Sequence, residues 1–146
     1  MIEIRWTALY DEPASTVFAV IAEPSSYPAW QPDVESACLA GDGPARQGAR
    51  IPQVRTVMGQ RTEVAMTITE LVPPELFTLA TDPGARPAVV QTYRLWPEEH
   101  GCRLEFHLTL DGVPTMAEHL AGAQLTSQIP QMLERLATIA ANRHPP

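Results

Sequence analysis

Apolar and polar residues alternate along much of this chain with a period of two, which is typical of half-buried β-strands. At the amino terminus Ile2, Ile4 and Trp6 alternate with polar residues, which predicts a strand over residues 2–10. Six further segments have strand character and end at turns rich in glycine, proline or acidic residues: residues 34–39, 49–58, 62–71, 76–81, 88–96 and 103–110. Their short connections predict antiparallel neighbours, because parallel strands need a long crossover between them.

Two parts of the chain lose this alternation and predict helices instead. Pro13 suits the first turn of a helix, and residues 17–21 supply a short apolar stripe after it. Residues 24–30 predict a second, very short helix, which Pro32 closes. After Pro114 the apolar residues recur every three or four positions, which predicts a long carboxy-terminal amphipathic helix.

The predicted order is one strand, two short helices, six strands and a long helix. A twisted antiparallel sheet of seven strands curls, and its concave face must be covered by another element. The carboxy-terminal helix is the one predicted element long enough to cover it. We therefore expect an α+β fold in which a curved seven-stranded sheet surrounds this helix, formed by residues 1–146 as a single domain. A cavity between the sheet and the helix would suit an apolar ligand.

The charge composition narrows the kind of partner. The chain has 10 basic and 17 acidic residues and a formal net charge of −7, which disfavours binding to nucleic acid or to an anionic membrane surface. Every basic residue is arginine, which excludes a lysine Schiff base and the lysine of a phosphate-binding loop. Cys38 and Cys102 are the only cysteines, too few for a disulfide framework.

The sequence carries no motif for a metal or a cofactor. Its four histidines have neither the spacing of two nor the spacing of four that metal ligands often have, and no glycine-rich dinucleotide motif follows a strand. We expect no metal and no cofactor. The amino terminus has strand character rather than that of a signal sequence, and no apolar run approaches the ~20 residues that cross a bilayer. We therefore expect a cytoplasmic protein without membrane insertion.

Four motifs carry a resemblance to a known family: Pro13-x-x-x-Val17-Phe18, Tyr27-Pro28-x-Trp30-x-Pro32-x-Val34, Gly48-x-Arg50 and Ile68-Thr69-Glu70-x-x-Pro73-Pro74. In this order and spacing they resemble the START-like superfamily and, within it, the bacterial polyketide cyclase/dehydrase and lipid-transport group, also called SRPBCC. The resemblance implies a helix-grip fold with a deep apolar pocket for a polyketide, lipid or sterol-like molecule. It does not imply one reaction, since members of the family cyclise, dehydrate, carry or sense their ligands.

Tyr93 and Gln91 are the leading candidates for contact with a ligand. They share a strand face with Val89 and Leu95, so both polar ends point into the pocket if that face is concave. Tyr93 could then donate a hydrogen bond to a ligand carbonyl or act as a weak general acid, and Gln91 could hold a carbonyl oxygen. The alternative is a buried tyrosine whose hydroxyl finds a backbone partner.

Arg55 is the candidate cation of the pocket. It shares one face of the strand over residues 49–58 with Ile51 and Gln53, and the periodicity does not show which face is concave. On the concave face its guanidinium would be a fixed cation for an enolate or a carboxylate. On the outer face, which we favour, it would be a solvated charge. Trp30 would either stack on a planar ligand at the pocket mouth or, as we favour, be a hydrophobic plug that pins the short helices to the sheet.

Four further residues complete the candidate site. His119 faces the sheet if the apolar stripe of the last helix is extended backwards, and it would then be a general base near pH 7. Gly122 makes that extension unsafe, so we favour a position outside the pocket. Glu70 shares a face with Met66 and would line the pocket or, as we favour, be solvated or paired at the strand end. Met66 and Phe106, on predicted apolar faces, are expected to line the pocket.

These residues and the resemblance predict a cofactor-independent polyketide cyclase/dehydratase-like enzyme acting on an apolar, carbonyl-rich substrate. Its expected catalytic residues are Tyr93, His119 and Arg55, and its expected substrate-binding residues are Trp30, Gln91, Glu70, Met66 and Phe106. The alternative is a non-catalytic carrier or sensor of a hydrophobic small molecule such as a lipid, polyketide or sterol. In either case the expected partner is a hydrophobic small molecule, and the protein itself is expected to be a monomer or a homodimer.

Overall fold

The computed structural model describes residues 1–57 and 59–143, and its elements follow the predicted order. They are β1 (Ile2–Tyr10), α1 (Ala14–Ile21), the 3₁₀ turn η1 (Pro24–Ser26), α2 (Tyr27–Trp30), β2 (Val34–Ala37), β3 (Arg50–Val57), β4 (Gln60–Val72), β5 (Leu76–Thr81), β6 (Ala88–Glu98), β7 (Gly101–Asp111) and α3 (Thr115–Arg143). Met58, the predicted last residue of the third strand, lies outside the described residues.

The seven strands form one sheet in the order β1-β7-β6-β5-β4-β3-β2. Every neighbouring pair is antiparallel, and the strands from β2 to β7 are joined as successive hairpins. β1 closes the sheet on the other side by pairing with β7, where Ile2 lies opposite Leu110 and Tyr10 lies opposite Cys102. The predicted helix-grip fold is therefore confirmed.

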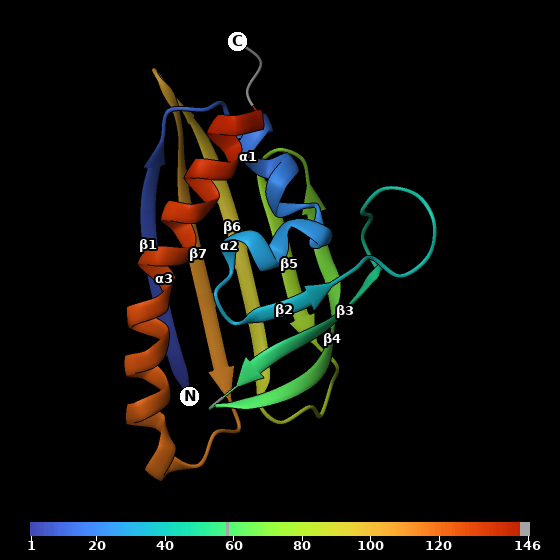
Figure 1. Ribbon diagram of the computed structural model, residues 1–146, viewed down its shortest axis with the longest axis vertical. Helices are drawn as coiled ribbons and strands as arrows, with labels where there is room; N and C mark the ends of the chain where they lie inside the picture. The colour runs from blue at the N-terminus through green and yellow to red at the C-terminus, as the bar shows by residue number, and fades with distance from the viewer. Residues whose placement is uncertain (58, 144–146) are drawn as a thin grey trace.

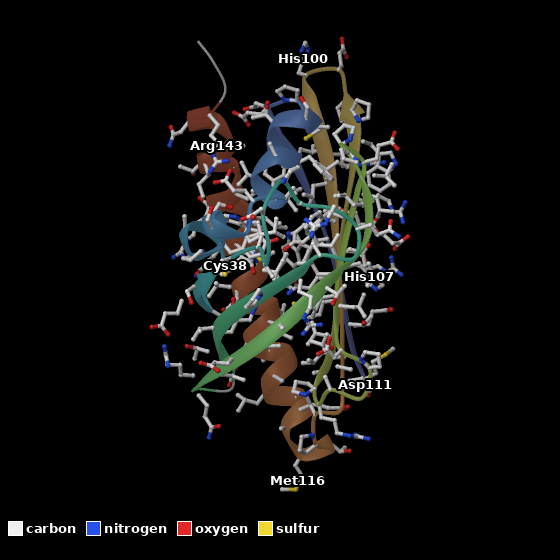
Figure 2. The ribbon with its side chains drawn as sticks, turned by 90° about the vertical axis from the view of Figure 1, so that its right-hand side faces the viewer. Cys38, His100, His107, Asp111, Met116 and Arg143 are labelled. Atoms are coloured by element: carbon white, nitrogen blue, oxygen red, sulfur yellow. The ribbon has the colours of Figure 1, made fainter. Side chains whose placement is uncertain are left out.

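All three α-helices lie on one face of the sheet, as Figure 1 shows. α3 packs against β1, and both α1 and α2 contact α3. The buried side of α3 carries Ala121, Ile129, Met132, Leu133, Leu136 and Ala140. This is the apolar stripe predicted for the carboxy-terminal helix, and it faces the core. The opposite face of the sheet is more polar: Figure 2 shows His107 pointing away from the helices, where its Nε2 lies 3.1 Å from a carboxylate oxygen of Glu3.

Two side-chain interactions fasten the second half of α3 to the rest of the fold. The Tyr10 hydroxyl, at the end of β1, donates a hydrogen bond to the carbonyl of Leu133 over 2.9 Å. The Arg143 guanidinium, at the end of α3, binds both carboxylate oxygens of Glu23 at 2.7 and 3.1 Å. The second half of α3 is thus held against both the sheet and the segment that follows α1.

Gly101 begins β7 at a point where no side chain fits. Its φ is +119°, and a Cβ built there would lie 1.8 Å from the carbonyl oxygen of Tyr10. The chain can turn from β6 into β7 and pass the end of β1 only because this residue is glycine.

A β-bulge in β4 turns Glu70 to the outer face of the sheet. The pairing passes from Ile68 opposite Leu79 to Glu70 opposite Thr78, so the alternation slips by one residue between the two pairs. Ile68 is fully buried, whereas Glu70 is exposed and accepts a hydrogen bond from the Thr78 hydroxyl at 3.1 Å. The assignment of Glu70 to the pocket lining is therefore corrected, because a count by twos cannot detect the bulge.

Candidate functional site

The inner face of β3 carries Arg55, so our preference for the outer face was wrong. Arg55 is 8% exposed, and Gln53 and Ile51 on the same face are also buried. Arg50, in the opposite phase of the strand, is exposed and pairs with Asp82 at the surface. The alternation of β3 therefore directs a guanidinium into the interior of the protein.

Three neighbours accept hydrogen bonds from the buried guanidinium, one from each nitrogen. Nε of Arg55 donates to Gln53 Oε1 at 2.7 Å, Nη2 donates to Gln31 Oε1 at 2.7 Å, and Nη1 donates to Asp33 Oδ2 at 2.8 Å. Together these four residues form the Arg55 cluster. Gln31 and Asp33 lie in the connection from α2 to β2, so the cluster ties this connection to the sheet. Asp33 supplies the negative charge that balances the guanidinium.

Aromatic rings pack beside the Arg55 cluster. Trp30 is fully buried, and its ring lies edge-to-face with Tyr27 at 5.5 Å and with Tyr93 at 6.0 Å between centroids. Tyr93 in turn packs against Phe106 at 5.0 Å, and the Trp30 Nε1 donates to the hydroxyl of Ser26 at 3.0 Å. Trp30 therefore fills the space between α2 and the sheet as a hydrophobic plug and does not line an open mouth.

Four buried polar atoms in and around this region have no hydrogen-bond partner within residues 1–57 and 59–143: Gln31 Nε2, Gln53 Nε2, Gln91 Oε1 and the Tyr93 hydroxyl. Arg55 determines how the first two amides point. A guanidinium only donates, so each amide turns its oxygen toward Arg55 and its NH₂ group away.

Leaving such atoms unpaired is costly. An unpaired buried donor or acceptor costs about 1–3 kcal/mol, and folded proteins pair nearly all of them with protein, water or ligand groups. The four atoms therefore mark hydrogen-bonding capacity that the described protein does not use itself. They offer donors at two amides, an acceptor at Gln91, and a phenol that does either.

Tyr93 is electrostatically part of the same site as the Arg55 cluster. Burial raises the pKa of the Tyr93 phenol well above its usual value, while the charge of Arg55 lowers this pKa and that of Asp33 raises it. The phenol therefore stays protonated at neutral pH and acts as a hydrogen-bond donor rather than a base. Gln91, two residues earlier on β6, shares the inward face of that strand.

His119 is not brought to this site. It is exposed and lies one turn after Met116, which Figure 2 shows at the far tip of α3. Together with Ile2 and Ile4 it lines a groove of about 890 Å³ between β1 and the first half of α3. Ala121 is buried, and a residue two positions away on a helix lies on roughly the opposite side. The expectation that His119 is a base beside Tyr93 is therefore corrected.

The remaining predicted residues are in the core. Met66 is 2% exposed and Phe106 is 1% exposed, and both belong to the main hydrophobic cluster. Phe106 contacts Tyr93 directly, as described above. Met66 lies opposite Ile51 in the sheet, two residue pairs away from Gln53. The polar site thus lies where the sheet faces α2, rather than where it faces α3 as the sequence had suggested.

Gln31, Gln53 and Asp33 were not predicted as site residues from the sequence. Gln53 shares its strand face with Arg55, so the correct choice of face would have identified it. Gln31 and Asp33 flank Pro32 in a connection without any periodicity, and only the folded chain brings them to β3. A surface hollow of about 560 Å³ over β2, β3 and β4 includes Gln53, but its other β3 residues, Pro52 and Val54, belong to the outer face of that strand.

Two general features concern the described part of the chain. No helix in it is long and apolar enough to cross a membrane. Within the same residues, no three histidine, cysteine, aspartate or glutamate side chains gather closely enough to hold a metal ion.

Solved structures with the same fold come from several sources. A protein from Thermus thermophilus superposes with a TM-score of 0.82 at 17% identity, covering 99% of this chain and 100% of that one. A START superfamily protein from Mycobacterium smegmatis has a TM-score of 0.80 at 10% identity, with 97% and 99% covered. The di-domain ARO/CYC BexL from the BE-7585A biosynthetic pathway has a TM-score of 0.71 at 17% identity, with 94% of this chain but 46% of that one covered. At these identities the likeness is one of fold.

Comparison with sequence families is more direct. No curated protein matches the chain. The family described as polyketide cyclase / dehydrase and lipid transport matches residues 1–141, which is nearly the whole sequence. The seven-stranded sheet, the long terminal helix and this match agree. This chain belongs to the polyketide cyclase/dehydrase and lipid transport family.

Proposed function

We propose that this protein binds an apolar small molecule that carries carbonyl or hydroxyl oxygens, and that it promotes a cofactor-independent cyclisation or dehydration of that molecule. The observation that carries the proposal is the set of four unpartnered polar atoms among buried aromatic and apolar side chains. Small-molecule sites commonly have this composition, an apolar lining with a few polar groups that fix the orientation of the ligand.

Neutral hydrogen-bond donors suit reactions at a carbonyl group. The protonated Tyr93 phenol and the NH₂ groups of Gln31 and Gln53 can donate to a carbonyl oxygen that gains negative charge as an enolate forms. Donors arranged in advance around such an oxygen commonly contribute about 10²–10³-fold in rate. The apolar walls would contribute by holding a flexible substrate in a reactive conformation.

A non-catalytic carrier is the second candidate, and one observation favours it. His119, the expected base, is exposed in a different groove, and the Asp33 carboxylate is engaged by Arg55. Among the described residues, the cluster therefore presents donors without a free carboxylate or imidazole to accept a proton. A carrier needs only the donors.

The first experiment is native mass spectrometry of the purified protein, together with extraction and identification of any small molecule that it retains. Tyr93→Phe is then compared with Tyr27→Phe, because the Tyr27 hydroxyl is also buried but already donates to the carbonyl of Ile21 at 3.0 Å. For an enzyme, Tyr93→Phe should lower kcat by at least about ten-fold with a small change in affinity. For a carrier, it should lower affinity alone.

Tyr27→Phe is the control for the loss of a buried hydroxyl. Tyr27→Phe should leave both kcat and affinity close to the values of the unmodified protein. The proposal is wrong if the purified protein is empty and also binds no member of a panel of apolar fluorescent ketones and alcohols.

A further inference from the structure

The charges in the site are already balanced. Arg55 and Asp33 carry one positive and one negative charge and form a direct ion pair. The other polar groups are the amides of Gln31, Gln53 and Gln91 and the Tyr93 phenol, which are neutral. The Tyr27 phenol, packed against Trp30, is also neutral because burial raises its pKa well above the usual value. A ligand carboxylate would bring an uncompensated negative charge into a buried space.

Each nitrogen of the guanidinium also already donates a hydrogen bond. Arginine binds a carboxylate best through two parallel hydrogen bonds from neighbouring nitrogens. In this site Nη1 of Arg55 is used by Asp33 and Nη2 by Gln31, while Nε is used by Gln53. Without displacing a partner, a ligand carboxylate could bind the guanidinium only through the two remaining N–H groups, one on Nη1 and one on Nη2, and it would then share a single positive charge with Asp33.

The other free donors of the site belong to neutral groups. Because Arg55 donates to the oxygens of Gln31 and Gln53, their NH₂ groups point away from it and have no partner among the described residues. The Tyr93 hydroxyl is similarly without a partner among the described residues. These groups match the lone pairs of a ketone, ester or alcohol oxygen.

We propose that this site selects ligands with neutral oxygen groups and rejects carboxylates, because Asp33 neutralises Arg55 and Arg55 orients the two glutamine amides. Arg55 is in this view a positioning residue, and Asp33 determines specificity. This inference rests on the proposed ligand-binding function and names the chemical class of the ligand.

The test uses two probes with the same fused ring, acetonaphthone, which ends in a neutral ketone, and naphthoate, which ends in a carboxylate. Their affinities are measured by calorimetry at pH 7. The unmodified protein should bind the ketone at least ten-fold more tightly. Asp33→Asn keeps the side-chain shape and removes the negative charge, so the ratio of affinities should shift toward naphthoate by at least ten-fold. Glu35→Gln is the matched control, because Glu35 pairs with Arg61 on the surface at 2.6 Å, and both are well exposed.

A second measurement needs no variant and so does not depend on how well Asp33→Asn folds. If only the neutral form of the carboxyl probe binds, its apparent affinity should rise about ten-fold for each unit of pH lowered from 7 to 5, while the affinity of the ketone stays constant. The phenols of Tyr27 and Tyr93 stay neutral over this range because burial raises their pKa values, so the probe is expected to supply the change.

The outcomes distinguish a failure of the selectivity from a failure of the proposed ligand binding. If naphthoate binds the unmodified protein as tightly as the ketone, or if Asp33→Asn changes the ratio no more than Glu35→Gln does, the selectivity is overturned and the ligand-binding proposal remains. If neither probe binds at any pH in this range, the ligand-binding proposal is contradicted and the selectivity falls with it.

Discussion

Three buried tyrosines differ in what their hydroxyl groups contact. Tyr10 donates to the carbonyl of Leu133 at 2.9 Å, and Tyr27 donates to the carbonyl of Ile21 at 3.0 Å. The Tyr93 hydroxyl has no such partner in the described part of the chain. The first two hydroxyls stabilise the fold, whereas the third is available to a ligand.

This contrast predicts opposite effects on stability. Tyr27→Phe should lower the free energy of unfolding by about 1 kcal/mol, because a buried hydrogen bond is lost. Tyr93→Phe should leave it unchanged or raise it by up to about 1 kcal/mol, because an unpaired hydroxyl is no longer buried. Urea denaturation monitored by circular dichroism measures both values. A Tyr93→Phe variant as destabilised as Tyr27→Phe would mean that the phenol has a partner inside the protein.

Arg55 offers a second test at the residue scale. Arg55→Met removes the donor from Asp33, Gln31 and Gln53, and leaves the Asp33 carboxylate partly buried without its counter-charge. We expect the free energy of unfolding to fall by about 3 kcal/mol, the lower end for a broken buried ion pair, because Asp33 still reaches solvent. The control is Arg50→Met on the same strand, whose exposed pair with Asp82 should contribute less than about 1 kcal/mol. Equal losses in denaturant titrations would contradict a structural role for the cluster.

At the scale of elements, the strands could be predicted because one face of the sheet is buried and the other is exposed to solvent. β7 is the clearest example: Leu104, Phe106 and Leu108 are buried, and Arg103 between two inward positions is exposed. β3 was harder, because its outer face carries Pro52 and its inner face carries polar side chains that the Arg55 cluster satisfies. Hydrophobicity alone could not identify the inner face, since the buried polar groups depend on partners from a distant connection.

Local irregularities explain why two other candidates, Glu70 and His119, lie outside the site, as the favoured alternatives for them had it. Glu70 is turned outward by a bulge, which shifts the alternation without any signal in residue type. His119 lies outside because the first half of α3 is mostly polar or exposed, with Met116 at 98% and Leu120 at 57% exposed. A stripe read from the well-packed second half of α3 therefore could not be extended to it.

The conformation of Gly101 at the turn into β7 leads to a specific prediction about stability. Gly101→Ala should lower the free energy of unfolding by at least about 2 kcal/mol, because its positive φ disfavours any side chain and its Cβ would collide with the Tyr10 carbonyl. Gly122→Ala, inside α3 with no heavy atom within 4 Å of the added Cβ, should instead raise it by about 0.5–1 kcal/mol. Thermal unfolding of the two variants gives the comparison. A neutral Gly101→Ala would show that the β6–β7 turn adopts another conformation in solution.

For the whole molecule, buried weak acids predict a loss of stability at alkaline pH. Burial raises the pKa of the Cys102 thiol to about 11, and burial also raises the pKa values of Tyr10, Tyr27 and Tyr93 well above the usual phenol value. In the unfolded chain a thiol loses its proton near pH ~8.5 and a phenol near ~10. The folded state therefore holds more protons than the unfolded state above these values, and the free energy of unfolding falls as pH rises.

Denaturant titrations at successive pH values test this predicted fall in the free energy of unfolding. The contribution of these groups should be fully present below about pH 8 and should decline steadily above pH ~9, through the raised pKa values of the folded state. Tyr93→Phe should make the decline shallower, because one of the raised phenols is gone. A free energy of unfolding that stays constant up to pH ~11 would contradict the burial of these groups.

The burial of Trp30 against Tyr93 also has an optical consequence. A fully enclosed indole emits at shorter wavelength than one in water, and Trp6, at 37% exposed, lies within reach of a dissolved quencher. Acrylamide should therefore first quench the long-wavelength emission of Trp6 and of the half-buried Trp96, and leave the emission of Trp30. A ligand that binds beside Tyr93 also lies beside the Trp30 indole. Its binding can therefore be followed, without an attached dye, as a change in the short-wavelength emission that remains after quenching.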